Sequence, residues 1–180
     1  EAALELAKAP YRIVDAATWN NTAAFAELKR VNPLHQIPTL VTPDGTVQSE
    51  SAAILIHLGL AHPRAGLLPA SASQRAQAIR AMVFIVANCY AAIGVIDYPQ
   101  RWHGKGDKDA DERLRKGARR RLHKLWCVFA DTVAAEAANK NAAFLFGVQP
   151  GAADLLAAVV SRWSGARKHL ARQRPALHAL

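Results

Sequence analysis

The segment that most constrains the fold is NPLHQIPTL at 32–40, because Pro38 directly precedes strand-like residues. Proline has no N–H for a strand ladder and normally avoids strand interiors. One solution is a cis Ile37–Pro38 bond in a tight bend, and a trans proline at the strand start is the alternative. A bend would leave the N–H and C=O of Ile37 pointing outward, where a peptide lying alongside could bond to them.

A second unusual segment, SESAAI at 49–54, begins a helical run. Free N–H groups and the helix dipole favour a carboxylate at such a start, and Ser51 can donate a further hydrogen bond. Glu50 could hold an ammonium group close by. The two residues could therefore bind the amino-acid end of a peptide. The alternative is that Ser49 or Ser51 only caps the helix and Glu50 favours its first turn.

The composition predicts a mostly helical chain in two parts. Hydrophobic residues make up 51% of the 180 residues, with Ala and Leu dominant, which favours helix. Strand and helix signals alternate in the first third, and after the linker at Pro63, Gly66 and Pro69 all signals are helical. We therefore expect an α+β domain over 1–64 and an all-helical bundle domain over 72–180.

Local signals predict the elements of the first domain. They are helices over 1–8, Ala23–Lys29 and 51–61, a short strand over Tyr11–Asp15, and a hairpin of Thr39–Thr42 with Thr46–Gln48. Thr22 is a possible N-cap for the second helix. Pro43-Asp44-Gly45 supplies the hairpin turn.

The second domain is expected to begin with one long helix. Its apolar stripe consists of Ile79, Met82, Val83, Val86, Tyr90 and Ile93. A break rich in Gly, Pro and charge follows at 98–109, and then comes a basic helix. The last strong helix has Leu155, Leu156, Val159, Val160 and Trp163 on one face.

The formal net charge of +9 is concentrated in the run RLRKGARRRLHK at 113–124, which raises the possibility of nucleic-acid binding. A helical stripe lies beside the basic residues, formed by Leu114, Ala118, Leu122, Leu125, Phe129 and Val133. No aromatic stacking platform accompanies the run. We therefore interpret it as the solvated face of a helix and expect no nucleic-acid partner.

The two cysteines and the apolar segments indicate a cytoplasmic protein. Cys89 and Cys127 have neither metal-ligand spacing nor a CxxC arrangement, which favours a reducing compartment and no metal site. The apolar stretches are short and interrupted, so we expect no transmembrane span and no membrane partner. The start EAALELAKAP lacks the features of a signal peptide.

These motifs together resemble the bacterial-type glutathione S-transferase family. They read NP…QIPTL at 32–40, PDGT at 43–46, ESAAI at 50–54 and LLP at 67–69, where the family has NPxGxVPxL, a DG turn, ESxAI and LxP. FLFG…ADLLAAVVSRW resembles the family's buried helix. The resemblance covers nearly the whole chain, and it implies a thioredoxin-like N-terminal domain followed by an all-α domain.

The resemblance implies that the proline bend and the helix start form one site for glutathione as co-substrate. Ile37 would offer main-chain bonds to the cysteinyl part, beside Pro38 as the cis proline. Glu50 and Ser51 would hold the γ-glutamyl end, and Gln36 could approach the glycyl end.

Two positions depart from the family pattern. Asp154 matches the aspartate of the family's helix-capping motif, whose role is structural, but Gly151 replaces the usual Ser or Thr. Glycine supplies no side-chain oxygen, so we expect a half-complete, weaker cap. His35 replaces a common glycine and is expected to face solvent.

The family's catalytic hydroxyl or thiol, which stabilises the glutathione thiolate, belongs to a segment before this sequence, so no catalytic residue is assigned. Tyr11 matches a packing tyrosine and is not a substitute. We expect the sequence to be trimmed at both ends and the first domain to lack its first strand, which leaves Tyr11–Asp15 without an obvious ladder partner.

The implied activity is conjugation of the glutathione thiolate to a small electrophile, in cytoplasmic detoxification. The residues expected to line the electrophile pocket are Asn88, Cys89, Tyr90, Arg101, Trp102 and His103. The family also implies a homodimer. The alternative is a non-catalytic, transferase-like binding or regulatory module.

Overall fold

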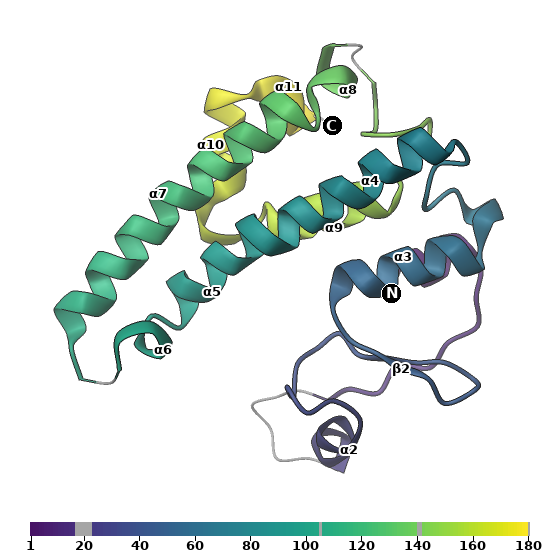
Figure 1. Ribbon diagram of the computed structural model, residues 1–180, viewed down its shortest axis with the longest axis horizontal. Coiled ribbons are helices and arrows are strands. Elements are labelled where there is room, and N and C mark those ends of the chain that lie inside the picture. Colours follow the sequence, from purple (N-terminus) through teal and green to yellow (C-terminus); the bar gives the residue numbers. More distant parts are fainter. Residues whose placement is uncertain (17–22, 105, 140–141, 180) are drawn as a thin grey trace. The chain divides into compact units, whose positions relative to one another are not determined.

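The computed structural model describes residues 1–16, 23–104, 106–139 and 142–179. The chain divides into two compact units, Glu1–Leu67 and Leu68–Leu180 (Figure 1). The division falls between the two predicted domain ranges. Of the 23 Lys and Arg residues, 18 lie in the second unit, together with eight of the 14 Asp and Glu residues. The positive charge of the chain therefore belongs to the second unit.

The first unit contains three α-helices and one hairpin within its described residues. They are α1 (Ala2–Ala7), α2 (Ala23–Val31), β1 (Leu40–Val41), β2 (Val47–Gln48) and α3 (Ser51–Ala61), followed by the 3₁₀ turn Pro63–Ala65. The predicted helices and the hairpin are confirmed. The predicted N-cap of α2, Thr22, lies outside the described residues.

The predicted strand over Tyr11–Asp15 is wrong, because that segment has no regular secondary structure. Ile13 and Val14 are exposed. The described sheet has two strands, β1 and β2, so this segment has no ladder partner within it. β-branched residues favour a strand only where a neighbouring strand pairs with their backbone.

The hairpin has a defined antiparallel register, with Leu40 opposite Gln48 and Val41 opposite Val47. Asp44 fixes its turn by accepting hydrogen bonds from the Thr42 hydroxyl and, at 3.0 Å, from the Thr46 N–H. These two bonds, the hydroxyl first, lower the pKa of Asp44 to about 2. The turn is therefore held by an ionised carboxylate at neutral pH.

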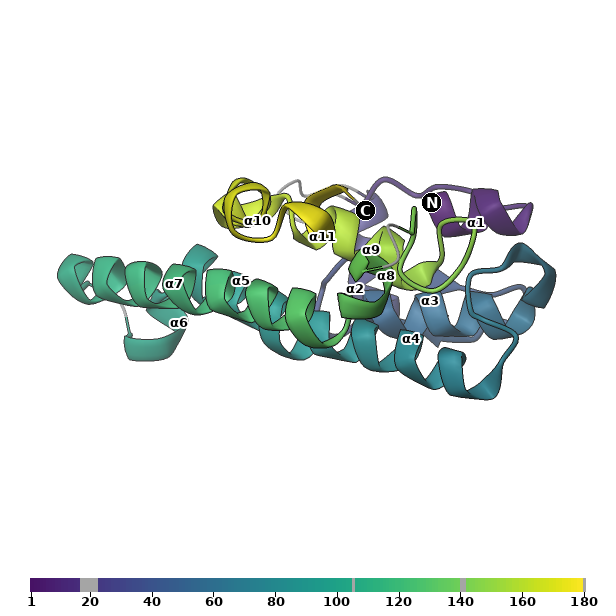
Figure 2. The same ribbon diagram turned by 90° about the horizontal axis from the view of Figure 1, so that it is seen from above.

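Within its described residues, the regular secondary structure of the second unit is all helical. Its elements are α4 (Ala72–Phe84), a π-helical segment (Ile85–Tyr90), α5 (Ala91–Asp97), α6 (Gln100–His103), α7 (Lys108–Thr132), α8 (Ala135–Asn139), α9 (Ala152–Val160), a 3₁₀ turn (Trp163–Gly165), α10 (Ala166–Gln173) and α11 (Pro175–Ala179). α7 runs beside α5 and α9 beside α4 in both views (Figures 1 and 2).

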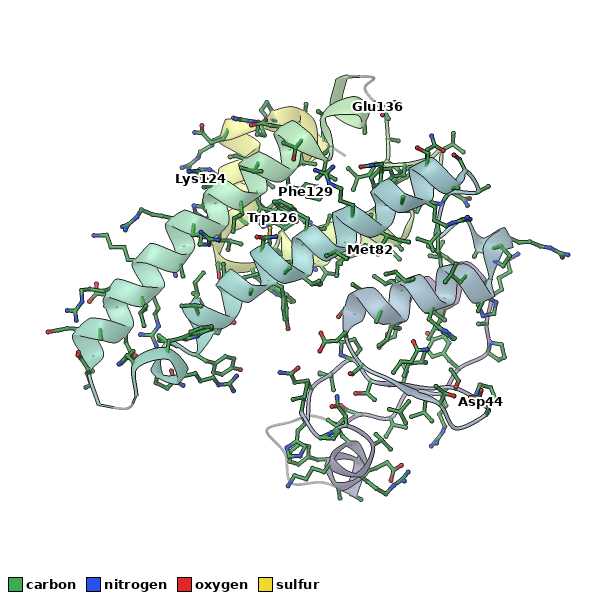
Figure 3. The ribbon with its side chains drawn as sticks, in the orientation of Figure 1. Asp44, Met82, Lys124, Trp126, Phe129 and Glu136 are labelled. Carbon is green, nitrogen blue, oxygen red and sulfur yellow. The ribbon has the colours of Figure 1, made fainter. Side chains whose placement is uncertain are left out.

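Large side chains from α4 and α7 build the core of the second unit (Figure 3). Trp126 and Phe129 are fully buried, with ring centroids 5.4 Å apart, and Met82 is fully buried on α4. The predicted stripe on the long helix is partly wrong, because Val83 and Tyr90 are exposed. Small side chains such as Ala81 and Cys89 fill the core instead. The predicted stripe contained only large apolar residues, so it identified partly the wrong side of the helix as buried.

The continuous helix over 72–97 is long and apolar enough to cross a membrane by length and composition alone, contrary to our expectation. Core helices pass the same test. The residues that make this helix apolar include a buried row of Ala78, Ala81, Met82, Ile85, Cys89, Ile93 and Ile96. Packing against α7 and α9 accounts for that row.

The basic run lies on α7, whose buried side contains Leu122, Trp126 and Phe129. The charged side chains on its other sides are mostly exposed: Arg113, Lys116, Arg119, Arg120, Arg121 and Lys124. Lys124 projects from the side opposite Trp126 (Figure 3). This distribution is that of an amphipathic helix with a solvated face.

Asp154 connects the start of α9 to the preceding loop. Its carboxylate accepts the Gly151 N–H at 2.9 Å and the Leu145 N–H at 2.8 Å. Burial raises the pKa of Asp154, while these two bonds oppose the rise. Gly151 supplies no side-chain oxygen in return, so one half of the reciprocal cap is present, as expected.

Replacing Asp154 with Ala should destabilise the protein by about 2 kcal/mol, since two part-buried N–H donors would lose their acceptor. Urea denaturation measures the change. Asp109→Ala is the control, because Asp109 is an exposed acid in the first turn of α7 and should shift the stability by less than about 0.5 kcal/mol. Equal effects of the two substitutions would contradict the structural role of Asp154.

Candidate functional site

A buried amide organises the loop that precedes β1. Asn32 is 3% exposed, and its Nδ2 donates to the Gln36 carbonyl and to the Thr39 hydroxyl oxygen, both at 3.0 Å. Its Oδ1 accepts the Leu34 N–H at 3.0 Å. No such role was predicted for Asn32, although an Asn-Pro pair before a loop is a sequence signal for it. The loop is therefore held at its start, middle and end.

The held loop presents the main chain of Ile37. The Ile37–Pro38 peptide bond is cis, as the resemblance implied, and the Ile37 side chain is 52% exposed. Within the described residues, neither the N–H nor the C=O of Ile37 forms a hydrogen bond. Gln36 and Pro38 are also exposed. Ile37 can therefore pair with an extended ligand by strand-like hydrogen bonds.

Among the residues that the structure describes, the backbone donors at the start of α3 have no partner. The first helical bond recorded there runs from the Ile54 N–H to the Glu50 carbonyl at 3.0 Å, so the N–H groups of Ser51, Ala52 and Ala53 precede the helical ladder. Glu50 makes no side-chain cap, and the first turn contains no acidic residue. The helix start can therefore accept an anionic group.

Glu50 adopts an unusual backbone conformation, with φ 68° and ψ 114°. A positive φ is uncommon for a residue with a side chain and costs about 1–3 kcal/mol. Such conformations cluster at functional sites. The conformation directs the chain from β2 into α3 and leaves the Glu50 side chain exposed.

The hairpin register connects the loop to the helix start. Leu40 pairs with Gln48, so the chain that precedes β1 and the chain that follows β2 leave the same end of the ladder. Pro38 lies two residues before Leu40, and Glu50 lies two residues after Gln48. Paired strands lie about 5 Å apart, so Ile37 and Ser51 belong to one edge of the first unit.

A second candidate site is a groove of about 390 Å³ within the helical unit. It lies on the long helix, α6 and α7, and it is lined by Ala87, Asn88, Ala91, Ala92, Val95, Trp102, Arg113, Leu114, Gly117, Ala118 and Arg121. Asn88 and Trp102 are two of the six residues predicted for the electrophile pocket. The α7 residues were missed, because the basic run was interpreted only as a solvated face.

The other four predicted pocket residues do not line this groove. Cys89 is fully buried, and burial raises its thiol pKa to about 12, so it is a core residue and not an accessible pocket residue. Tyr90 packs on the Trp163 ring at 5.7 Å, and the Arg101 guanidinium lies 4.2 Å from the Tyr98 ring centroid.

His103 has a structural contact, since its Nε2 lies 2.6 Å from Asp111 Oδ1. It therefore joins α6 to α7 and helps to position the neighbouring Trp102.

The described residues provide no obvious activator for a thiol. The Tyr11 hydroxyl donates to Glu5 at 2.6 Å, and that bond is the main reason why the pKa of Tyr11 is raised; the side chain is exposed and does not have the packing role that the resemblance implied. Cys127 and Cys89 are free cysteines in the helical unit. No group of three His, Cys, Asp or Glu side chains in the described part of the chain could hold a metal ion.

The first unit matches a known family. Residues 1–60 match the model of the glutathione S-transferase N-terminal domain. The chain is 36% identical over 117 residues to the uncharacterized GST-like protein YncG of Escherichia coli, covering 64% of this chain and 55% of YncG. It is 43% identical over 65 residues to a probable maleylacetoacetate isomerase of Caenorhabditis elegans, covering 36% and 29% of the two chains. The chain thus spans about half or less of these relatives.

The fold is shared with solved structures. A glutathione transferase homolog from Sulfitobacter, solved with bound glutathione, has a TM-score of 0.76 and 20% identity, covering 98% of this chain and 82% of that chain. Identity at this level shows the fold alone: a thioredoxin-like N-terminal domain followed by an all-α domain, as predicted. The first unit therefore matches the glutathione S-transferase N-terminal domain, and the chain has the fold of a glutathione transferase.

Proposed function

We propose that this protein is a glutathione transferase that joins the thiol of glutathione to a small electrophile. The supporting observation is that one end of the hairpin presents both the unbonded main chain of Ile37 and the uncapped start of α3. One set of groups suits an extended peptide backbone, and the other suits a carboxylate. Glutathione, an extended tripeptide with an amino-acid end, contains both.

Each residue of this edge has a role in the proposal. Ile37 exchanges main-chain hydrogen bonds with the cysteinyl residue, beside the cis Pro38. The N–H groups at the start of α3 and the Ser51 hydroxyl hold the γ-glutamyl carboxylate, and Glu50 pairs with its ammonium group. Gln36 lies exposed beside Ile37 and contacts the glycyl end. The Sulfitobacter homolog, solved with glutathione, has the same fold.

The chemistry requires a thiolate and a bound acceptor. The glutathione sulfur attacks an activated carbon of the electrophile, and binding supplies proximity and orientation. We assign the acceptor to the groove of the helical unit, where Asn88 and Trp102 contribute polar and apolar contacts. The activating hydroxyl or thiol belongs to none of the residues assigned above. A cytoplasmic homodimer acting in detoxification completes the proposal.

The second candidate is a glutathione-binding module without catalysis. Its supporting observation is that Tyr11 already has a partner in Glu5 and Cys89 is buried, so neither suits thiol activation. Conjugation of glutathione to a chloronitrobenzene, followed by absorbance, separates the two candidates. Turnover above the uncatalysed rate favours the enzyme, and binding without turnover favours the module.

Replacing both Glu50 and Ser51 with Ala should weaken glutathione binding at least about tenfold, because charge-assisted hydrogen bonds to the γ-glutamyl end are lost. Retention on immobilised glutathione with elution by free glutathione, followed by calorimetric titration, measures the loss. Glu27→Ala is the control: Glu27 is an exposed acid of the same unit, paired with Arg30 at 2.7 Å. Unchanged binding by the double variant would refute the assigned site.

Glu50→Gly should separate binding from stability. Glycine adopts a positive φ without a steric penalty, so the substitution should leave the free energy of unfolding unchanged or raise it by about 1 kcal/mol, while glutathione binding falls. Glu50→Ala keeps a side chain at φ 68°, so it should weaken glutathione binding without raising the free energy of unfolding. Chemical denaturation and titration test both variants. A clear loss of stability in Glu50→Gly would rule out strain at this position.

A further inference from the structure

We propose that the acceptor substrate contains a carboxylate, which Arg113 and Arg121 bind at the groove of the helical unit. This inference rests on the proposed transferase function and names the class of its electrophile: a small, flat, apolar molecule with a carboxylate at its edge.

The charge of the groove has one sign. Among the described residues that line it, Arg113 and Arg121 are the charged side chains, and no Asp or Glu is present. The two arginines lie eight residues apart on α7, which corresponds to about 12 Å along the helix axis. Both flank Leu114, Gly117 and Ala118 of the lining. A carboxylate is the complementary ligand group, because a guanidinium matches its geometry.

Both guanidinium groups are available for a ligand. Within the described residues, neither Arg113 nor Arg121 forms an ion pair. The pKa of Asp107 is lowered first by the Ala110 N–H and to a smaller extent by the charge of Arg113.

Other arginines of this unit are engaged. The Arg115 Nε donates to the Ile96 carbonyl at 3.2 Å, and Arg174 makes two bonds to Asp131, at 2.6 and 2.8 Å. An arginine that already has a hydrogen-bond partner is less able to bind a ligand. Arg113 and Arg121 differ from Arg115 and Arg174 because they have no such partner within the described residues.

The apolar lining suits a flat ligand body. Ala87, Ala91, Gly117 and Ala118 are small, so the helices leave room between them. A side chain added at Gly117 would meet no atom within 4 Å, which places open space at that position. Small residues along facing helices thus create the depth of the groove.

Trp102 supplies an aromatic side to the groove. It is 65% exposed, although tryptophan side chains are on average mostly buried. The contact between His103 and Asp111 joins α6 to α7, and Pro99, directly before α6, is fully buried. Trp102 is therefore held in place with an apolar surface available for stacking.

Binding is tested first, without any reaction. The probes are 3-nitrobenzoate and 3-nitrobenzamide, which have the same ring and differ in charge, and calorimetry measures their affinities. The wild-type protein should bind the benzoate about tenfold more tightly than the amide. The variant Arg113→Gln/Arg121→Gln should lose that preference. The variant Arg119→Gln/Arg120→Gln is the matched control: it removes the same charge from exposed positions of α7 outside the groove, and the preference should persist.

A second variant tests the space itself. Gly117→Leu should fill the groove and weaken both probes, and its helix should remain intact, because leucine favours helix more than glycine does. Circular dichroism and thermal unfolding confirm that each variant is folded. Equal affinity for the two probes, no binding of either, or a preference that survives the Arg113/Arg121 substitutions would overturn the proposal.

The reaction is tested with 4-chloro-3-nitrobenzoate and 4-chloro-3-nitrobenzamide. The glutathione sulfur forms a bond to the ring carbon that carries chlorine, chloride leaves with the bonding electrons, and the thiol proton passes to solvent. The ratio of kcat/KM values, each divided by its uncatalysed rate constant, should favour the benzoate about tenfold and fall to about one in Arg113→Gln/Arg121→Gln.

The two tests separate this inference from the proposed function. Suppose that 3-nitrobenzoate binds in an arginine-dependent way and that neither chloronitro compound is turned over. That result would support the carboxylate site and count against the transferase. Turnover of 4-chloro-3-nitrobenzoate and 4-chloro-3-nitrobenzamide with equal kcat/KM values, each divided by its uncatalysed rate constant, would support the transferase and overturn the carboxylate preference.

Discussion

The proposed glutathione site depends on one short ladder, the pairing of Leu40 with Gln48. Asp44 fixes the turn on one side of this pairing, and the buried amide of Asn32 fixes the loop on the other side. Both residues bond to groups close to them in the chain. Because side chains and backbone groups alternate along paired strands, a slip by one residue would place Ile37 opposite a different part of α3. The register therefore determines whether a peptide backbone and a carboxylate can be bound together.

Local signals in the sequence predicted much of this unit. The PDG turn, the run at 51–61 and the unusual Pro38 predicted the hairpin, α3 and the cis bond, since each depends on residues close together in the chain. The strand at Tyr11–Asp15 failed, because a strand exists only with a partner, and the resemblance had already implied that this segment lacks an obvious one. The strained φ of Glu50 had no signal, since it results from how β2 joins α3.

The helical unit shows a different limit. Amphipathic spacing identified the buried side of α7 but treated the basic run as one solvated surface. Arg113 and Arg121 line the groove and Arg119 and Arg120 do not, a difference that depends on which residues the neighbouring helix places beside α7. Cys89 was expected at the pocket and lies in the core, because the prediction ranked large apolar side chains above small ones. Both differences arise from contacts between helices, which a single helical pattern does not contain.

The central claim, that one edge of the first unit binds glutathione, is tested most directly by nuclear magnetic resonance. A titration of the ¹⁵N-labelled protein with glutathione should shift the amide signals of Ile37, Ser51, Ala52 and Ala53 together, with one common dissociation constant. The exposed turn around Asp44, at the other end of the hairpin, should not respond. Shifts confined to the helical unit, or separate dissociation constants for Ile37 and for the start of α3, would contradict the claim.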